Sequence, residues 1–274
     1  MNDSGKPAWL DNSHPNYKRW ERSRKLSEAR GQFVLSVIEI TTECNNLRIL
    51  DLGSGEGGTS AVLSKNNFVV SADISVDRLK RQQSKNNNYE LLLCDALFTP
   101  FKNKSFDLII IQDVIEHVAS PEDLIENIFK LIKPGGIIYL STPNKLSMFN
   151  LIADPHWGLP VVSILKRDKI RKYFLKYFRK NEMNRKDIAQ LLSLKELQKL
   201  FYGKFSYELN TKHSLQRLFR GDKGIVWSDL HLFLIKTLKM FYLDKLLILL
   251  SNNKPGIINK FFNPTFYFIL KKNN

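Results

Sequence analysis

The chain has 274 residues, of which 43% are hydrophobic and 25% are charged, and no internal repeat is present. These proportions exclude wholesale disorder and a repeat array, and the length fits one large domain or one domain with a cap. Two cysteines cannot form a disulfide framework and favour a reducing compartment. Residues 1–15 lack an apolar core, and no apolar run reaches about 18 residues, so we expect neither a signal peptide nor a membrane-spanning helix.

The excess of positive charge lies entirely in the second half. The chain carries 42 Lys and Arg against 27 Asp and Glu, a net charge of +15. Residues 1–150 contain 18 basic and 18 acidic residues, whereas residues 151–274 contain 24 basic and 9 acidic residues. The neutral first half argues against a protein that coats nucleic acid over its whole surface.

Residues 18–144 alternate between helical patterns and short apolar runs. We predict helices at 18–44, 58–65, 76–85 and 121–132 and strands at 48–52, 68–73, 90–95, 106–112 and 137–140. Ser120 can cap the last of these helices, and its first turn contains Pro121 and two acidic residues. Such alternation predicts an α/β fold, with a parallel sheet covered on both faces and ligands at the carboxyl ends of its strands.

The pattern changes after residue 144. Residues 145–190 and 211–263 are basic, apolar and predominantly helical, and between them we predict a helix at 194–200 and a strand at 205–209. A last strand is predicted at 262–270. We therefore expect three regions, with N-terminal helices at 1–47, a core at 48–144 and a basic cap carrying the last two strands at 145–274.

A glycine-rich loop, DLGSGEGG at residues 51–58, joins the first strand to a helix. It fits the G-x-G-x-x-G pattern, in which glycines let backbone N–H groups approach a pyrophosphate. Asp73 ends the next strand 20 residues after Gly53, where a carboxylate meets ribose hydroxyls; its alternative role is that of a helix cap. Asp51 and Glu56 would repel a pyrophosphate and suit a ligand that carries ammonium and sulfonium charges.

Several motifs in order resemble the class I S-adenosylmethionine-dependent methyltransferases, particularly the small-molecule branch that includes the ubiquinone-biosynthesis methyltransferases. The matching segments are RILDLGSGEG at 48–57, SADIS at 71–75, CDA at 94–96 followed by PF at 100–101 and SFDLI at 105–109, QDVIEHV at 112–118, LIKPGG at 131–136 and TPN at 142–144. The resemblance covers 48–144 well and the late strands loosely. It implies a Rossmann-like, seven-stranded, mostly parallel sheet with its last strand antiparallel, helices on both faces and the basic helical cap inserted between late strands.

The resemblance also implies S-adenosyl-L-methionine as the cofactor and assigns roles to residues of this chain. The methionine part would contact the first strand, the glycine loop and the fourth strand through Asp51, Gly53, Ser54, Gly55, Gly57 and Gln112. Asp51 would hold the ammonium group, directly or through water. The adenosine part would contact the ends of the second and third strands, with Asp73 on the ribose, Ile74 and Ala96 beside the adenine and Asp95 on its amino group.

Methyl transfer needs alignment and the exclusion of water, and a base only if the acceptor must lose a proton. We expect His156 to be that base, with His117 as the second candidate; each could instead have a packing role. Trp157 would then cover the sulfonium. Surface or packing roles are expected for His14, His213 and His231, and no Cys/His cluster has metal-ligand spacing, so no metal is predicted.

Two segments of the basic half could meet a membrane. Residues 170–180 place aromatic side chains at helical spacing opposite basic ones, and residues 230–250 are still more apolar but interrupted by lysines. Both fit a helix lying in an anionic membrane surface, and both also fit a cap packed on the sheet with a solvated basic face. The chain is thus predicted to be cytoplasmic and peripheral on the inner face of the membrane.

The combined pattern predicts a methyltransferase acting on a small-molecule or lipid-linked acceptor, with O-methylation favoured. One alternative is an NAD(P)-dependent Rossmann oxidoreductase, which the glycine pattern also permits. Third come an RNA methyltransferase and a non-catalytic membrane adaptor that keeps only the cofactor fold. Nucleic acid is disfavoured because no RNA-binding module is recognisable.

Overall fold

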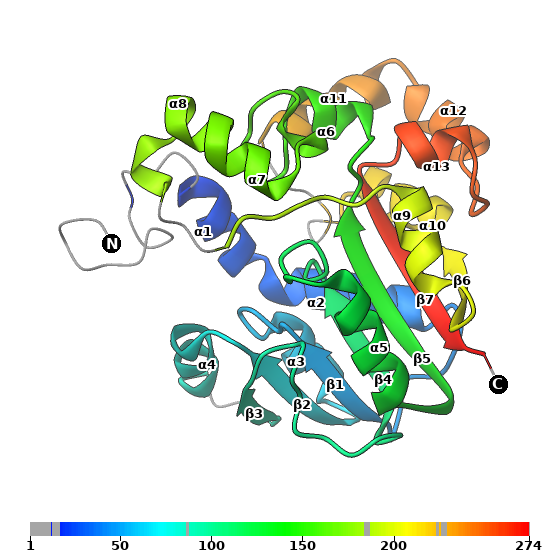
Figure 1. Cartoon of the computed structure of the whole chain (residues 1–274). Coiled ribbons are helices and arrows are strands. Elements are labelled where there is room, and N and C mark those ends of the chain that lie inside the picture. The colour runs from blue at the N-terminus through cyan, green and yellow to red at the C-terminus, as the bar shows by residue number, and fades with distance from the viewer. Residues whose placement is uncertain are drawn as a thin grey trace.

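The computed structural model describes residues 12, 17–85, 88–183, 187–222, 225 and 229–273. Seven strands form one sheet in the order β3-β2-β1-β4-β5-β7-β6 (Figure 1). The strands are β1 Arg48–Leu52, β2 Phe68–Asp73, β3 Glu90–Leu93, β4 Phe106–Gln112, β5 Ile132–Pro143, β6 Phe205–Leu209 and β7 Thr265–Lys272. β7 is antiparallel to both of its neighbours, whereas β1 to β5 run parallel, which confirms the predicted seven-stranded fold.

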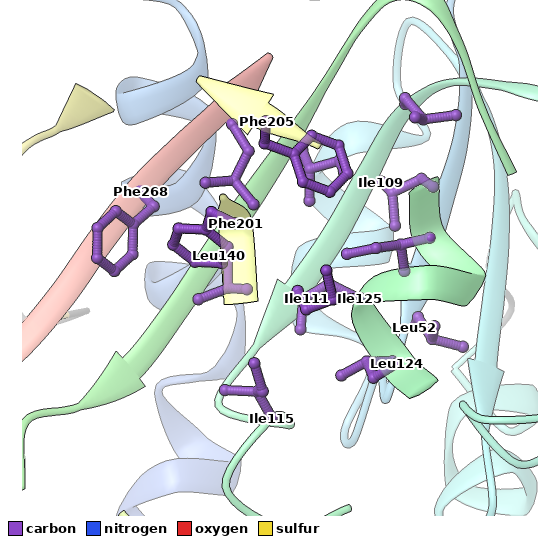
Figure 2. Close-up of a cluster of buried hydrophobic side chains, with 14 of the residues drawn as sticks. Leu52, Ile109, Ile111, Ile115, Leu124, Ile125, Leu140, Phe201, Phe205 and Phe268 are labelled. Carbon is purple, nitrogen blue, oxygen red and sulfur yellow. The ribbon is translucent and has the colours of Figure 1, made fainter. Parts of the chain in front are cut away.

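Helices cover both faces of the sheet because its central strands are apolar on both sides. Along β4, Ile109 and Ile111 belong to one buried cluster (Figure 2). Leu108 and Ile110 belong to another, as the alternation of side chains along a strand requires. On the first face lie α5 Pro121–Leu131 and α9 Leu194–Phe201, and on the second lie α2 Ser27–Ile38, α3 Gly58–Leu63 and α10 Thr211–Phe219. α4 Val76–Gln83 follows β2 at the edge.

The helix and strand signals in the core are confirmed with small shifts. Ser120 caps α5 by accepting a hydrogen bond from the Asp123 backbone N–H at 3.1 Å. The helix predicted at 18–44 is instead two helices, α1 Tyr17–Lys25 and α2, because Leu26 between them leaves the helical conformation. β3 ends two residues earlier than predicted.

β5 is much longer than the four-residue strand predicted at 137–140. It runs for 12 residues, begins directly after α5 and continues past a register shift opposite Phe106 and Leu108 of β4. Its second half pairs with β7, from Ile137 opposite Lys271 to Pro143 opposite Thr265. α5 ends at Leu131, and the Pro-Gly-Gly segment at 134–136 lies within β5 at the register shift. Pairing with β7, which lies far along the chain, extends the strand to Pro143.

The segments between the late strands form the cap. α6 Met148–Ile152, α7 Arg167–Lys169 and α8 Lys176–Phe178 lie between β5 and β6, and a π-helical stretch at Ile170–Leu175 joins the last two into one rod. α10, α11 Asp229–Met240, α12 Leu243–Leu250 and α13 Ile257–Phe261 lie between β6 and β7. Within the described ranges, no helix is both long enough and apolar enough to cross a bilayer.

Candidate functional site

The glycine loop follows β1 at the carboxyl edge of the parallel strands. Gly53, Gly55 and Gly57 all have positive φ angles, of 77°, 58° and 74°, which side chains rarely adopt. A Cβ on Gly53 would lie 2.4 Å from Cγ2 of Val114, whereas one on Gly55 would meet nothing within 4 Å. The loop is therefore packed against the protein at Gly53, whereas the space beside the Cα of Gly55 is open.

The glycine that completes the dinucleotide-type pattern serves helix packing. A Cβ on Gly58 would lie 2.1 Å from the backbone carbon of Ser27, and one on Gly31 would lie 2.6 Å from the Gly58 oxygen. These two glycines let α2 and α3 cross closely. Gly58 is thus explained without a pyrophosphate.

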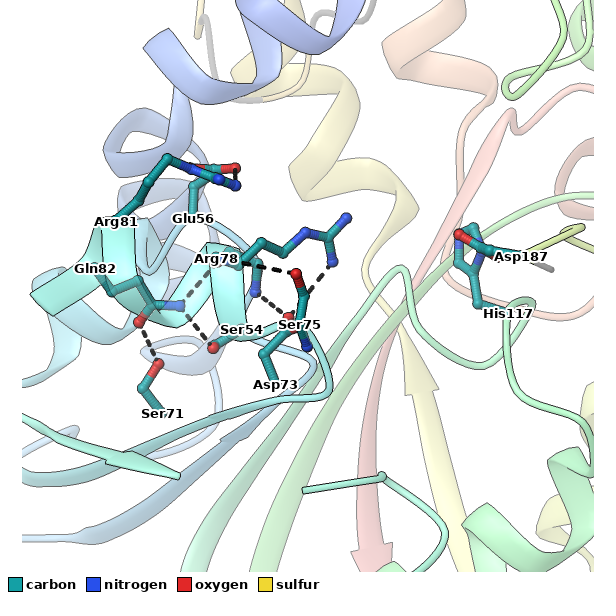
Figure 3. Close-up of polar contacts among 11 residues, drawn as sticks. Ser54, Glu56, Ser71, Asp73, Ser75, Arg78, Arg81, Gln82, His117 and Asp187 are labelled. Carbon is teal, nitrogen blue, oxygen red and sulfur yellow. Dashed lines mark hydrogen bonds and ion pairs between the residues drawn. The ribbon is translucent and has the colours of Figure 1, made fainter. Parts of the chain in front are cut away.

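Asp73 holds the loop to the end of β2. Its Oδ2 accepts a hydrogen bond from the Gly55 N–H at 2.8 Å, and its Oδ1 accepts one from the Ser75 N–H at 2.8 Å (Figure 3). The side chain is 2% exposed, and Arg78 Nη1 lies 3.5 Å from Oδ2. Ser75, not Asp73, caps α4, so the helix-cap alternative is wrong. Asp73 instead holds the turn between β2 and α4, at the position where ribose binding is predicted.

Gln82 on α4 supports the same loop, and the sequence analysis did not identify it. Its amide nitrogen donates to Ser54 Oγ at 3.0 Å and to the Gly55 carbonyl at 2.8 Å, while its Oε1 accepts from Ser71 Oγ at 2.7 Å (Figure 3). The side chain is fully buried although α4 reads as a polar helix. A buried amide with this many partners fixes the conformation of the loop.

The charge argument made from Asp51 and Glu56 is wrong for Glu56. Arg81 makes two hydrogen bonds to the Glu56 carboxylate, at 2.7 and 3.1 Å, and holds its pKa below the usual range despite burial. Asp51 is 1% exposed and accepts from Ser60 Oγ at 2.6 Å, and burial raises its pKa to about 6. The Glu56 carboxylate therefore neutralises the charge of Arg81 on α4. Only Asp51 keeps the role predicted for it, contact with the ammonium group of the methionine part.

The remaining predicted cofactor residues lie along the same edge. Ile74, beside Asp73, is 68% exposed, so its side chain is free to contact a ligand. Asp95 and Ala96 follow β3, where Asp95 Oδ1 accepts from the Leu97 N–H at 2.9 Å. Gln112 ends β4, and its Oε1 accepts from Thr59 Oγ1 at 2.8 Å. Parallel strands place these residues in a row, as their predicted roles require.

The two candidate bases, His117 and His156, meet beyond the end of β4. Their ring centroids lie 5.0 Å apart with the planes at 77°. His117 Nδ1 lies 2.6 Å from Oδ1 of Asp187, which comes from the cap 70 residues later (Figure 3). The sequence analysis did not single out Asp187, because no local pattern connects it to His117.

Glu116 adds a buried carboxyl group to this histidine pair. It is 1% exposed, and its Oε2 accepts from Thr142 Oγ1 at 2.9 Å, whereas Oε1 has no hydrogen-bond partner among the described residues. The candidate ligand atoms of Glu116, His117 and His156 lie within 4.8 Å of one another, close enough for one metal ion to reach all three. The prediction of no metal rested on sequence spacing, which does not detect this proximity.

The pH dependence of stability tests the protonation state of Glu116. Burial raises its pKa from 4.5 to about 7. Between these values the folded state binds more protons than the unfolded state, so stability falls as pH rises from about 4.5 to 7. Gln at this position stays neutral, so Glu116→Gln should exceed wild type in unfolding free energy at pH 8 by on the order of 1–3 kcal/mol, and by much less at pH 5.

Urea unfolding at the two pH values measures this difference, and the titration of Asp51 cancels because both proteins contain it. Glu122→Gln, at an exposed position in the first turn of α5, is the matched control and should show no such pH dependence. Equal stability of Glu116→Gln and wild type at pH 8 would show that Glu116 carries no burial penalty.

Trp157 does not take its predicted position over the sulfonium. It is 2% exposed and packs inside the cap, with its ring 5.3 Å from that of Phe174 and with Ile170 in the same buried cluster. His213 has the packing role that was expected, 3.0 Å from Ser36 Oγ. His14 lies outside the described residues, as does the side chain of His231.

An ion pair that was not predicted from the sequence lies directly after β4. Asp113, which follows Gln112 with a φ of 56°, pairs with Arg30 of α2 and accepts from Ser141 Oγ at 2.9 Å. It ties α2 to the ends of β4 and β5. Helix α2 is thereby anchored at the edge where the predicted cofactor residues lie.

Comparisons with known proteins agree with this fold. A family model described as a methyltransferase domain matches residues 50–140. The ubiquinone biosynthesis O-methyltransferase of Coxiella burnetii is 35% identical over 123 residues, which are 40% of this chain and 50% of that protein. The malonyl-[acyl-carrier protein] O-methyltransferase of a Marinomonas species is 28% identical over 141 residues, 48% of this chain and 52% of that protein. The chain thus spans about half the length of the curated relatives it matches.

Solved structures share the fold over most of the chain. An S-adenosylmethionine-dependent methyltransferase from Mesorhizobium loti superposes with a TM-score of 0.55 at 15% identity, over 87% of this chain and 96% of that one. Phosphoethanolamine N-methyltransferase 2 of Haemonchus contortus, in complex with S-adenosyl-L-methionine, gives a TM-score of 0.53 at 16% identity, over 96% of this chain and 58% of that one. At these identities the likeness concerns the fold alone.

Proposed function

We propose that this chain, which carries a class I S-adenosylmethionine-dependent methyltransferase domain at residues 50–140, methylates an oxygen of a small-molecule or lipid-linked acceptor. The domain itself is established by the family match and by the seven-stranded sheet, which confirm the resemblance found in the sequence. The acceptor and the methylated atom are the proposal. The observation that carries it is the row of Gly55, Asp73 and Gln112 at the carboxyl edge, with an imidazole pair beyond β4.

O-methylation is supported by the histidines and by the names of the relatives. A hydroxyl acceptor must lose its proton in or before the transition state, and an imidazole can take it. The matched proteins from Coxiella burnetii and Marinomonas are named as O-methyltransferases. In the proposed reaction the acceptor oxygen forms a bond to the methyl carbon, the bond from that carbon to sulfur breaks, and the proton passes to His156 or His117.

Most of the rate enhancement would come from alignment and exclusion of water, since the sulfonium supplied by the cofactor is already activated. The glycine loop, held by Asp73 and Gln82, positions the methionine part, and the ends of β2 and β3 position the adenosine part. The cap, of which His156 is part, covers the side on which the acceptor enters.

Two measurements test the proposal against its alternatives. Calorimetry should detect S-adenosylmethionine binding and no NADH binding; the reverse would favour the Rossmann oxidoreductase. Release of S-adenosylhomocysteine is then screened with hydroxylated quinone precursors, carboxylate acceptors and RNA. Turnover with RNA alone would support an RNA methyltransferase. Binding without turnover on any acceptor would support a non-catalytic adaptor.

We further infer that the protein is cytoplasmic and associates with the inner face of the membrane through its basic half. The structure alters the helix predicted to do so at 170–180. Ile170 and Phe174 are buried in the cap cluster, whereas Tyr173, Tyr177 and Phe178 are 51%, 66% and 68% exposed. The apolar face is therefore divided: one half packs inside the cap and the other faces outward.

Lys172 and Lys176 provide the test of this basic segment. Each Nζ lies over the ring of the next residue, 5.2 Å from the Tyr173 centroid and 5.6 Å from the Tyr177 centroid, so cation and aromatic ring face a membrane together. Replacing both lysines with Gln should weaken binding to phosphatidylserine-rich vesicles by up to about thirtyfold at low salt, since each lysine near such a surface contributes about 1 kcal/mol.

Vesicle sedimentation at low and high salt measures this change. The control is replacement of Lys65 and Lys102 with Gln, which removes the same charge from exposed sites at the opposite, amino edge of the sheet. If the wild-type protein does not sediment with these vesicles at low salt, the basic half is a solvated cap. Cell fractionation tests the cellular location.

A further inference from the structure

α12 is an apolar helix without a buried side chain. Six of its eight residues, LDKLLILL, are leucine or isoleucine, and none is buried. Leu249 is 79% exposed and Leu250 is 53% exposed. Contiguous exposed apolar surface on a folded protein marks a site of interaction, because leaving it in water is unfavourable.

The apolar surface extends to both neighbouring helices. On α11 it includes Phe233 and Met240, at 64% and 66% exposure, and in the following turn Tyr242, at 72%. On α13 it includes Ile257, also 72% exposed. We call these residues, with the exposed residues of α12, the α11–α13 surface: Leu232, Phe233, Met240, Phe241, Tyr242, Leu243, Leu246, Leu247, Leu249, Leu250, Ile257 and Phe262.

Lysines alternate along the chain with the residues of this surface, and few acids accompany them. Residues 232–262 contain five lysines and one aspartate, Asp244. Within the described part of the chain, no carboxylate pairs with Lys236, Lys245, Lys254 or Lys260, all of which are exposed. A second copy of the chain would bring like charges together here, whereas an anionic lipid surface would neutralise them while accepting the apolar side chains.

The α11–α13 surface lies on the side of the molecule that carries the candidate active site. Asn144, directly after β5, donates to the carbonyls of Asn259, Lys260 and Asn263 at 3.3, 3.1 and 2.8 Å, so α13 is held at the carboxyl end of β5. Figure 1 shows the cap helices α6, α7, α8, α11, α12 and α13 as one layer across this side of the sheet. The outer side of that layer faces away from the strands.

We propose that the α11–α13 surface inserts into the headgroup–acyl boundary of an anionic bilayer and holds the carboxyl edge of the sheet toward the lipid. The inference deepens the membrane association proposed above and rests on it, but it assigns insertion to an element between β6 and β7 that lies outside the family match at 50–140. The apolar side chains enter the boundary, and the lysines contact lipid phosphates. A lipid-linked acceptor would then reach the site without leaving the membrane.

Sedimentation of the full chain with vesicles tests the surface directly. Leu249→Ser combined with Leu250→Ser should lower the partition onto vesicles of phosphatidylcholine and phosphatidylglycerol by about tenfold or more, and should leave folding intact because neither side chain is buried. Tyr202→Ser is the matched control. Tyr202 is 87% exposed but lies at the amino edge, just before β6 pairs with the end of β7. The Tyr202→Ser protein should bind vesicles as wild type does.

Insertion is distinguished from surface contact by a second pair of variants. Leu249→Trp should be quenched by lipids with brominated acyl chains well beyond the background of the native tryptophans, and Tyr202→Trp should not. The assignment would be overturned if the double serine variant bound vesicles as tightly as wild type, or if the two tryptophan variants were quenched equally. Ultracentrifugation showing a dimer that the double change dissociates would also overturn it.

These assays need no methyl transfer, so their outcome is separate from that of the proposed activity. An inactive chain that still inserts through Leu249 would refute the methyltransferase proposal and leave the surface in place. A protein that binds S-adenosylmethionine and turns it over but ignores anionic vesicles would refute the surface and leave the activity in place.

Discussion

Replacing His156 with Gln is expected to lower kcat by about a hundred- to ten-thousandfold and to leave the Kd for S-adenosylmethionine nearly unchanged, because a general base contributes that much to rate. His156 is half-buried in the cap loop, where its backbone N–H donates to Asp154 Oδ1 at 2.7 Å. Gln keeps the polarity of the side chain but has no lone pair basic enough to take the acceptor proton. The loss should therefore appear in turnover and not in cofactor binding.

His117→Gln tests the second candidate for the same role. The 2.6 Å contact of His117 Nδ1 with Asp187 fixes the orientation of the imidazole and places its other nitrogen on the side of Glu116, whose Oε1 lies 4.0 Å away. The wild-type rate should fall as pH is lowered into the range where imidazoles become protonated, since a protonated imidazole cannot accept a proton. The variant that removes the base should lose this acid limb.

The measurement is kcat against pH for wild type, the two variants and His213→Gln as the control. His213 packs against Phe33 and Ser36 on the other face of the sheet, so its replacement should leave the profile unchanged. If both test variants keep nearly full kcat and the wild-type profile is flat from about pH 5.5 to 8, no histidine acts as base. The enzyme would then act by alignment on an acceptor that is already nucleophilic.

The sheet, and the meeting of the candidate cofactor residues at one of its edges, were predictable because their signals are local. Each strand of the core is a short apolar run that ends at a turn, and each helix between them carries a cap or an apolar stripe. Asp73, Asp95 and Gln112 then fall at one edge because parallel strands present their carboxyl ends together. β6 was predicted at 205–209 and is found at Phe205–Leu209.

Contacts between distant segments were not predictable in this way. The interaction of His117 with Asp187 joins residues 70 positions apart, and that of Arg30 with Asp113 joins residues 83 positions apart. Neither pair has a sequence pattern, because the tertiary fold alone brings the partners together. Buried polar side chains on helices that read as polar, such as Gln82, are missed for the same reason.

Amphipathic patterns in the cap predicted which helix faces are apolar but not what those faces contact. The spacing of Ile170, Phe174 and Tyr177 predicts one apolar helix face, but it does not show whether that face meets protein or lipid. The structure buries the first two of these residues in the cap together with Trp157 and leaves Tyr177 exposed. The more apolar segment at 230–250, which periodicity describes equally well, has no buried side chain in its second part, α12. Composition thus identified the segments, and only the packing separates core from surface.

Replacing Asp73 with Ala is expected to weaken S-adenosylmethionine binding by about ten- to a hundredfold. Loss of the hydrogen bonds that ribose hydroxyls donate to a charged carboxylate lowers the binding free energy by roughly 1.5–3 kcal/mol. The structure adds a second route to the same loss, because Asp73 also accepts from the Gly55 and Ser75 N–H groups and so holds the glycine loop. A simple loss of affinity would not separate the two causes.

A double-mutant cycle with a modified ligand separates them. Calorimetry compares wild type and Asp73→Ala, each with S-adenosylhomocysteine and with its 2′,3′-dideoxyribose analogue. If Asp73 binds the ribose, removing the hydroxyls should weaken binding to wild type by about tenfold or more and should hardly affect binding to Asp73→Ala. If Asp73 only holds the loop, the substitution should weaken both ligands by the same factor, and the ribose assignment would be wrong. Unchanged binding of both ligands to a folded Asp73→Ala protein would remove Asp73 from the cofactor site altogether.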